Sequence, residues 1–155
     1  MASILKVDQI QLSNGSTPTA GDLGIDTSGT VLQVKSTVYS GSTTDNSSNV
    51  YNNWPGEIGT GLTLTPRSAD SKFLIVWSLF VHRNNGLYTC HNFLCREVNG
   101  VLDRNIAVGD ASGVRTRCTF GVRSSSGGII EPPRSGQFLD SPNTASDVTY
   151  KFQYN

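Results

Sequence analysis

Phe73-Leu-Ile-Val-Trp-Ser-Leu-Phe-Val81 is an apolar run in which eight of the nine residues are hydrophobic and most are β-branched or aromatic. The run is too short for a membrane-spanning helix, and its composition favours a β-strand. A continuous apolar run, without alternation of polar residues, predicts a strand that is buried on both faces. We therefore expect this segment to be the central strand of the hydrophobic core.

The rest of the chain is poor in helix-forming residues. Its 155 residues include only three Glu, four Lys and six Ala, against 19 Ser, 15 Thr and 16 Gly. The composition and the strand pattern together predict an all-β antiparallel β-sandwich of jelly-roll type with about eight strands, in which the central strand and the next two form a meander. Besides the central run, candidate strands cover residues 31–39, 61–65, 87–98, 101–108, 116–123, 136–139 and 148–154.

The N-terminal residues differ from those that follow. A loop rich in Pro, Gly, Ser and Thr separates a short apolar segment from the strand-rich region, so we expect an arm over residues 1–30 and a β-sandwich domain over residues 31–155. The arm needs a surface to cover its apolar side chains, either its own sandwich or a partner subunit. These side chains are the first candidate subunit or particle contacts: Ile4, Leu5, Val7, Ile10 and Leu12.

Charge and targeting signals limit the function classes. The formal net charge is zero and only 15% of the residues are charged, against about 25% in an average globular domain. A neutral chain predicts no nucleic-acid role and no attraction to an anionic membrane. Lys6 and Asp8 interrupt any apolar signal-peptide core, and no apolar run reaches 18 residues, so we expect a soluble protein with no membrane insertion.

Neither a metal site nor an enzyme is expected. The cysteines, Cys90, Cys95 and Cys118, are predicted to be free buried thiols, because an offset of five along a strand places the first two on opposite faces. Gly109-Asp-Ala-Ser-Gly113 superficially resembles a nucleophilic-serine turn with His82 or His91 as the base, but a simple turn between strands explains it. The three glutamates, Glu57, Glu97 and Glu131, lie beside turns without forming a glycosidase-like pair. We predict no catalytic, cofactor-binding or metal-binding residues.

Two groups of residues are candidate contact sites. Arg115, Arg117 and Arg123 are predicted to share the exposed face of one strand, where guanidinium groups suit phosphate, sulfated glycan or carboxylates of another subunit. A solvated face balanced by aspartates is the alternative, and we favour a subunit contact. Tyr51 and Trp54 lie in a polar loop, where they form either a sugar-stacking surface for a receptor or a lid over the core.

Six segments, taken in order, resemble a known group of proteins. They are Ser3-Ile-Leu-Lys-Val-Asp-Gln-Ile10, Leu62-Thr-Leu-Thr-Pro66 with Ser71-Lys-Phe-Leu-Ile75, Gly109-Asp-Ala-Ser-Gly-Val-Arg-Thr-Arg117, Phe138-Leu-Asp-Ser-Pro-Asn-Thr144 and Val148-Thr-Tyr-Lys-Phe-Gln153. The chain is similar, over nearly its whole length, to small virion structural proteins of marine tailed bacteriophages, including cyanophages. Those proteins generally continue beyond the last segment, so either a final hairpin is missing after Asn155 or a neighbouring chain covers that edge.

The resemblance implies a structural protein of the virion, made in the cytoplasm of the bacterial host. It implies a homotrimeric tail-fibre or adhesion appendage attached through the N-terminal arm, with other virion proteins and a host surface glycan as further partners. A capsid decoration protein on the head shell is the alternative, and an enzyme that degrades envelope polysaccharide is the third. The resemblance provides no catalytic residues and no cofactors.

Overall fold

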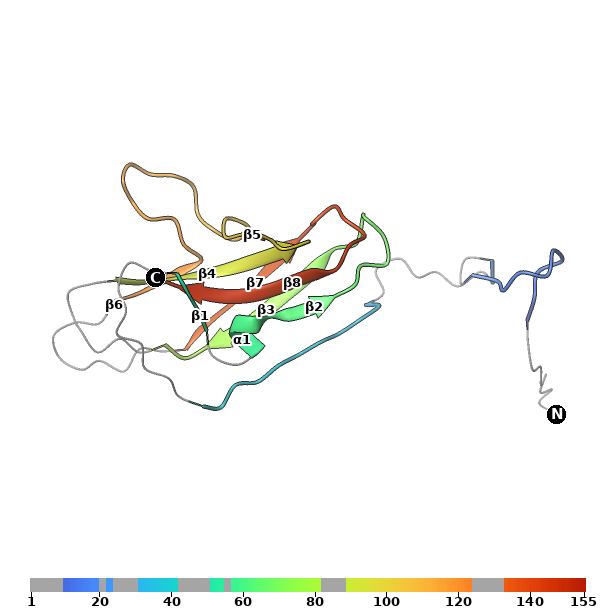
Figure 1. Ribbon diagram of the computed structural model, residues 1–155, viewed down its shortest axis with the longest axis horizontal. Helices are drawn as coiled ribbons and strands as arrows, with labels where there is room; N and C mark the ends of the chain where they lie inside the picture. Colours follow the sequence, from blue (N-terminus) through green and yellow to red (C-terminus); the bar gives the residue numbers. More distant parts are fainter. Residues whose placement is uncertain are drawn as a thin grey trace, which may run out of the picture. The chain divides into compact units, whose positions relative to one another are not determined.

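The all-β prediction is confirmed. A computed structural model of the chain describes residues 10–19, 22–23, 31–41, 51–54, 57–81, 89–123 and 133–155, without the side chains of Glu57 and Arg123. The chain divides into two units, residues 1–34 and residues 35–155. The described part of the second unit holds eight strands in two antiparallel sheets and one helical turn (Figure 1). The elements are β1 (Asn52–Asn53), α1 (Glu57–Thr60), β2 (Leu62–Leu64), β3 (Phe73–Leu79), β4 (Thr89–Val98), β5 (Val101–Asp103), β6 (Phe120–Arg123), β7 (Arg134–Asp140) and β8 (Val148–Tyr154).

The larger sheet is built around β4 and β8, which pair in register from Asn92 opposite Tyr154 to Val98 opposite Val148. The other edge of β8 pairs with β1 and β2, and the other edge of β4 pairs with β5 and β6. The β4–β5 hairpin turns at Asn99-Gly100, where both residues have positive φ, as this two-residue turn requires. The sequence therefore predicted this hairpin and the last strand correctly.

The smaller sheet consists of β3 and β7, paired from Phe73 opposite Asp140 to Leu79 opposite Arg134. The predicted meander is therefore wrong, because β3 pairs with a strand far along the chain while β4 lies in the other sheet. The two sheets face each other across a core centred on Leu79, Leu94 and Phe152.

Only one face of β3 is buried, so the prediction of burial on both faces is also wrong. Its residues alternate between the core and the exterior, and the Trp77 indole packs edge-on against the Phe152 ring with centroids 5.6 Å apart. On the exterior, Leu74 and Val76 are 62% and 69% exposed. The physical reason is that a two-layer sandwich covers each sheet on one side only. We call this exterior surface of β3 and β7 the outer face, and it comprises Leu74, Val76, Ser78, Ser135, Gln137 and Leu139.

A hydrogen-bonded cluster, here called the clamp, joins the two sheets at one end. Nη1 of Arg96 on β4 lies 2.9 Å from Oδ1 of Asp140 on β7, and the Tyr150 hydroxyl donates to Oδ2 of the same carboxylate at 2.6 Å. Nη2 of Arg96 also lies 3.4 Å from Oδ2 of Asp103. Burial and the adjacent Asp140 carboxylate raise the pKa of Tyr150, which therefore stays protonated and keeps donating.

The segment 31–41 forms no strand, although the sequence predicts one over residues 31–39. Among the described residues it has no sheet partner, and a strand requires one. Its side chains are exposed apart from Thr37, which is half-buried. In the first unit, Leu12–Ser16 form a turn closed by the Leu12 N–H and the Ser16 carbonyl at 2.9 Å.

Candidate functional site

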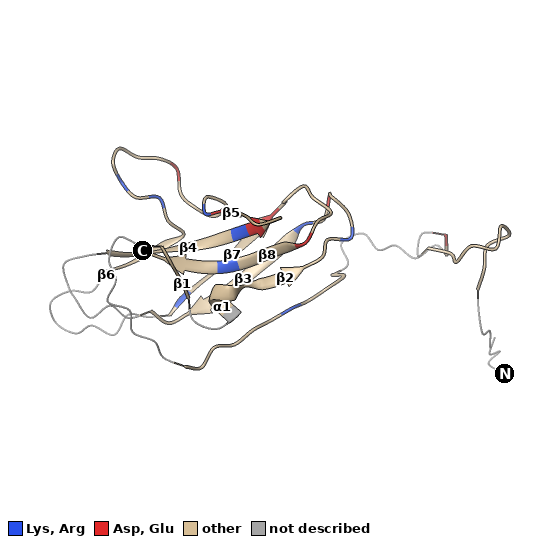
Figure 2. Cartoon of the chain, in the orientation of Figure 1, with Lys and Arg blue, Asp and Glu red and all other residues tan. Residues whose placement is uncertain are grey.

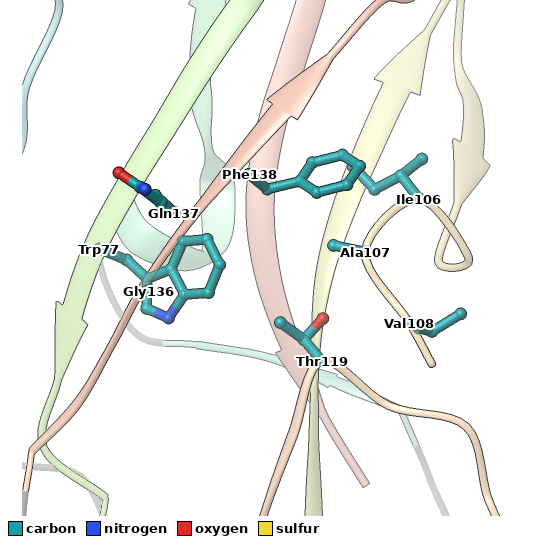
Figure 3. A pocket seen from close by; sticks show the side chains of 8 residues that line it. All are labelled: Trp77, Ile106, Ala107, Val108, Thr119, Gly136, Gln137 and Phe138. Carbon is teal, nitrogen blue, oxygen red and sulfur yellow. The ribbon is translucent and has the colours of Figure 1, made fainter. Parts of the chain in front are cut away.

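An open pocket of about 410 Å³ lies between β7 and the connection from β5 to β6. One side is formed by Gly136, Gln137 and Phe138 of β7 together with Trp77 of the neighbouring strand (Figure 3). The other side is formed by residues 106–108 and Thr119. None of the eight lining residues is charged, so the pocket suits an uncharged, largely apolar occupant.

Trp77 and Gly136 form one wall of the pocket. They are cross-strand partners, and Figure 3 shows the indole lying beside the glycine. A Cβ at position 136 would lie 2.8 Å from Cε2 of Trp77, so only glycine leaves room for the ring. In the same view the Phe138 ring points toward Ile106 across the pocket. The shape of this wall therefore depends on a small residue opposite a large one.

Thr119 fixes the opposite wall. Its hydroxyl oxygen accepts a hydrogen bond from the Leu94 N–H at 2.8 Å, and its own N–H donates to the Asn92 carbonyl at 2.8 Å. The hydroxyl takes the place of a backbone acceptor beside β4, and the chain leaves the sheet at this point. β6 therefore begins at Phe120 and not at the predicted residue 116.

The late start of β6 corrects the predicted arginine face. Arg115 and Arg117 lie in the exposed connection between β5 and β6, while Arg123 lies at the end of β6 and its side chain is outside the described part. Nε of Arg117 donates to the Gly109 carbonyl at 2.7 Å. The three guanidinium groups thus do not share one strand face. Long exposed connections of this kind are often functional.

The two aromatic candidates of the polar loop lie in different environments. Trp54 packs against the core cluster and makes an edge-on contact with Tyr154, so it occupies the position of a lid. Tyr51 remains exposed on the opposite side of the larger sheet. Its ring packs against Phe93, and the Arg104 guanidinium lies 4.5 Å from its centroid. A cation–π contact of this type holds the ring in place.

Arg104 and Gln153 extend this arrangement into a polar network. Nε of Arg104 donates to Oε1 of Gln153 at 2.6 Å, and Nε2 of Gln153 donates to Oδ1 of Asn53 at 2.7 Å. Gln153 is buried, so the network satisfies its amide. Arg104 could not be identified from the sequence, because no local pattern links it to Tyr51 and Gln153, which are each about fifty positions away.

The thiols and carboxylates do not converge. Cys95 is fully buried, and this burial raises the pKa of its thiol to about 11, which opposes a nucleophilic or metal-binding thiolate. Glu97 lies 2.6 Å from Nζ of Lys151 in an ion pair. Within the described ranges no three metal-binding side chains gather, and the three cysteines are free.

Several predicted residues cannot be placed in this geometry. Ile4, Leu5 and Val7 lie outside the described residues, as do His82 and Glu131. Ile10 is exposed and Leu12 is half-buried within the first unit. Ser112 lies in the exposed connection between β5 and β6, where its carbonyl accepts a hydrogen bond from the Arg115 N–H. The one helix of the described part, α1, has four residues, far fewer than the roughly 20 that a membrane-spanning helix needs.

The chain matches no protein-family model, and no curated protein or solved structure matches it significantly. The resemblance to phage virion proteins therefore depends on the quoted segments alone.

Proposed function

We propose that the chain is a structural protein of a tailed bacteriophage virion, and that it acts as a homotrimeric tail-fibre or adhesion appendage attached through its N-terminal arm. The observation that carries the proposal is the outer face, an uncharged surface on which Leu74, Val76 and Leu139 are 57–69% exposed. Exposed apolar residues that adjoin on one sheet face form a surface that a protein partner can cover. The virion location is proposed because the quoted segments resemble, in the same order, those of phage virion proteins.

The chemistry of the outer face favours association between copies of one chain. Leu74 and Leu139 are direct cross-strand neighbours, and the Ser135 hydroxyl lies 3.0 Å from the Ser78 hydroxyl. β3 carries no charged residue (Figure 2). A surface without charge cannot select a partner by electrostatic complementarity, whereas it suits close contact with an equally uncharged surface, such as that of a second copy.

Other features support a binding role and not catalysis. The exposed arginines of the β5–β6 connection are proposed as subunit or particle contacts, and Tyr51 is proposed as part of a surface for a host glycan. No reaction is proposed, because Cys95 is buried and Glu97 is paired with Lys151. Capsid decoration is the second candidate, since an arm and a sandwich serve equally well on a head shell.

Particle composition tests the role. Purified virions of the phage that encodes the chain should contain it, and quantitative mass spectrometry with antibody labelling in electron micrographs should give its copy number and position. A few trimers at the tail would support a fibre, whereas hundreds of copies over the head would support decoration. Absence of the protein from purified virions would refute both.

A matched pair of substitutions tests the outer face. Val76→Asp should convert the oligomer to monomers in light scattering, because burying an unpaired carboxylate is costly. Val101→Asp is the control, since Val101 is 73% exposed on β5, away from the outer face. Both variants should melt like the wild type at low concentration. An oligomer unaffected by Val76→Asp would show that the outer face is not the contact.

A further inference from the structure

We propose that the pocket at β7 is a docking groove for an extended segment of a second copy of the chain, residues 31–41. The inference rests on the self-association proposed above and adds a second contact to that of the outer face. The groove supplies a strand edge, because among the described strands β7 pairs only with β3. It also supplies apolar walls on both sides, from Phe138 and Trp77 to residues 106–108.

The segment 31–41 has the composition of a strand that lacks its sheet. At two-residue spacing it presents Leu32, Val34 and Val38 on one side, with Ser36 between them. The other side carries Gln33, Lys35 and Thr37, with Val31 and Tyr39 at its ends. The three apolar side chains are exposed, and Val38 reaches 90%. Laid along β7, the segment would turn its apolar side toward the walls of the groove and its lysine toward solvent. This is the usual pattern of recognition by strand addition.

The sheet order indicates that the occupant comes from another chain. Lys35 is held beside β2, where its Nζ donates to the Thr63 carbonyl at 2.6 Å. In the larger sheet β2 and β5 lie on opposite sides of β8 and β4. Three strand spacings of about 4.8 Å separate them by about 14 Å. The groove lies beside the chain that leaves β5, and none of residues 31–41 lines it within their own chain.

Cross-linking between chains tests the proposal directly. Chains carrying only Val38→Cys are mixed with chains carrying only Val108→Cys, dissociated, allowed to reassemble and oxidised. We expect a covalent dimer, with the two introduced cysteines joined in one peptide by mass spectrometry. Val101→Cys replaces Val108→Cys in the control and should give no dimer. The wild type, with its free Cys90, Cys95 and Cys118, identifies links through the native thiols.

The other outcomes separate the proposals. A cross-link formed only within a chain that carries both Val38→Cys and Val108→Cys would overturn docking between copies. An oligomer that gives no cross-link would overturn the groove while leaving self-association standing. Absence of the protein from virions would instead refute the proposed function and leave the groove intact. Val38→Asp should weaken association at least tenfold in sedimentation without changing the melting of the isolated chain, because Val38 is exposed there.

Discussion

Asp140→Asn should strongly destabilise the sandwich, because this carboxylate holds both sheets in the clamp. It accepts from Arg96 of β4 and from Tyr150 of β8, and its side chain is only 8% exposed. Asparagine has nearly the same shape, so the change removes the charge without leaving a cavity. The Arg96 side chain, which is 22% exposed, then keeps only the longer contact between its Nη2 atom and Oδ2 of Asp103, at 3.4 Å.

The magnitude follows from the loss of the carboxylate charge and of one of its two hydrogen-bond partners. Removing one partner of a buried ion pair costs about 3–5 kcal/mol. Arg96 is 22% exposed and the amide oxygen still accepts one hydrogen bond, so we expect a loss of about 2–3 kcal/mol in the free energy of unfolding. Urea melts followed by tryptophan fluorescence measure it. Asp147→Asn is the control, because Asp147 is exposed and accepts from the Thr65 hydroxyl, and it should cost less than about 1 kcal/mol.

A double variant separates the charge from the packing. Replacing Asp140 by Leu and Arg96 by Met removes both charges together, so it should destabilise the fold less than Asp140→Leu alone. A loss below about 1 kcal/mol for Asp140→Asn would mean that the clamp contributes little to holding the sheets together.

Core packing and a buried thiol give three further expectations. Gly136→Ala should cost about 1–3 kcal/mol in denaturant melts, because the methyl group meets the Trp77 ring, whereas Gly109→Ala has open space and should not. Trp77→Ala should cost about 2–4 kcal/mol, and a loss below about 1 kcal/mol would place the indole outside the core. Burial raises the pKa of the Cys95 thiol from 9.0 to about 11. The stabilisation that the protonated thiol gives to the folded state is therefore complete below about pH 9 and is lost between about pH 9 and 11. Cys95→Ala should reduce the loss in the free energy of unfolding over that pH range.

Local patterns in the sequence predicted several elements well. β8 follows from the two-residue spacing of Val148, Tyr150 and Phe152, whose side chains are all buried. The β4–β5 hairpin follows from Asn99-Gly100, because few other residue pairs adopt positive φ twice in succession. Such features depend on residues that are neighbours along the chain, so a short stretch of sequence is enough to predict them.

Features that depend on distant partners were predicted less well. The pairing of β3 with β7 brings together residues about sixty positions apart, and no local signal marks that choice. The prediction of an arginine face was wrong for a similar reason. The Thr119 hydroxyl accepts from the Leu94 N–H, and β6 begins only after it, so Arg115 and Arg117 lie outside the strand. The pocket walls likewise come from residues 106–108, Thr119 and β7, which only the fold brings together.

The wrong prediction that β3 is buried on both faces is relevant to the proposed function. The apolar run predicts burial on both faces, yet a single chain covers only the face that carries Trp77 and Leu79. Leucine and valine gain no free energy of burial on a surface that stays in water, and exposed apolar strands promote unwanted association. If the outer face is covered in the assembled particle, the two-sided apolar pattern describes β3 correctly in that state. The same reasoning applies to residues 31–41, whose strand pattern has no sheet among the described residues of its own chain. Both patterns then describe contacts made between copies, and Val76→Asp and Val38→Asp should disturb assembly without disturbing the fold.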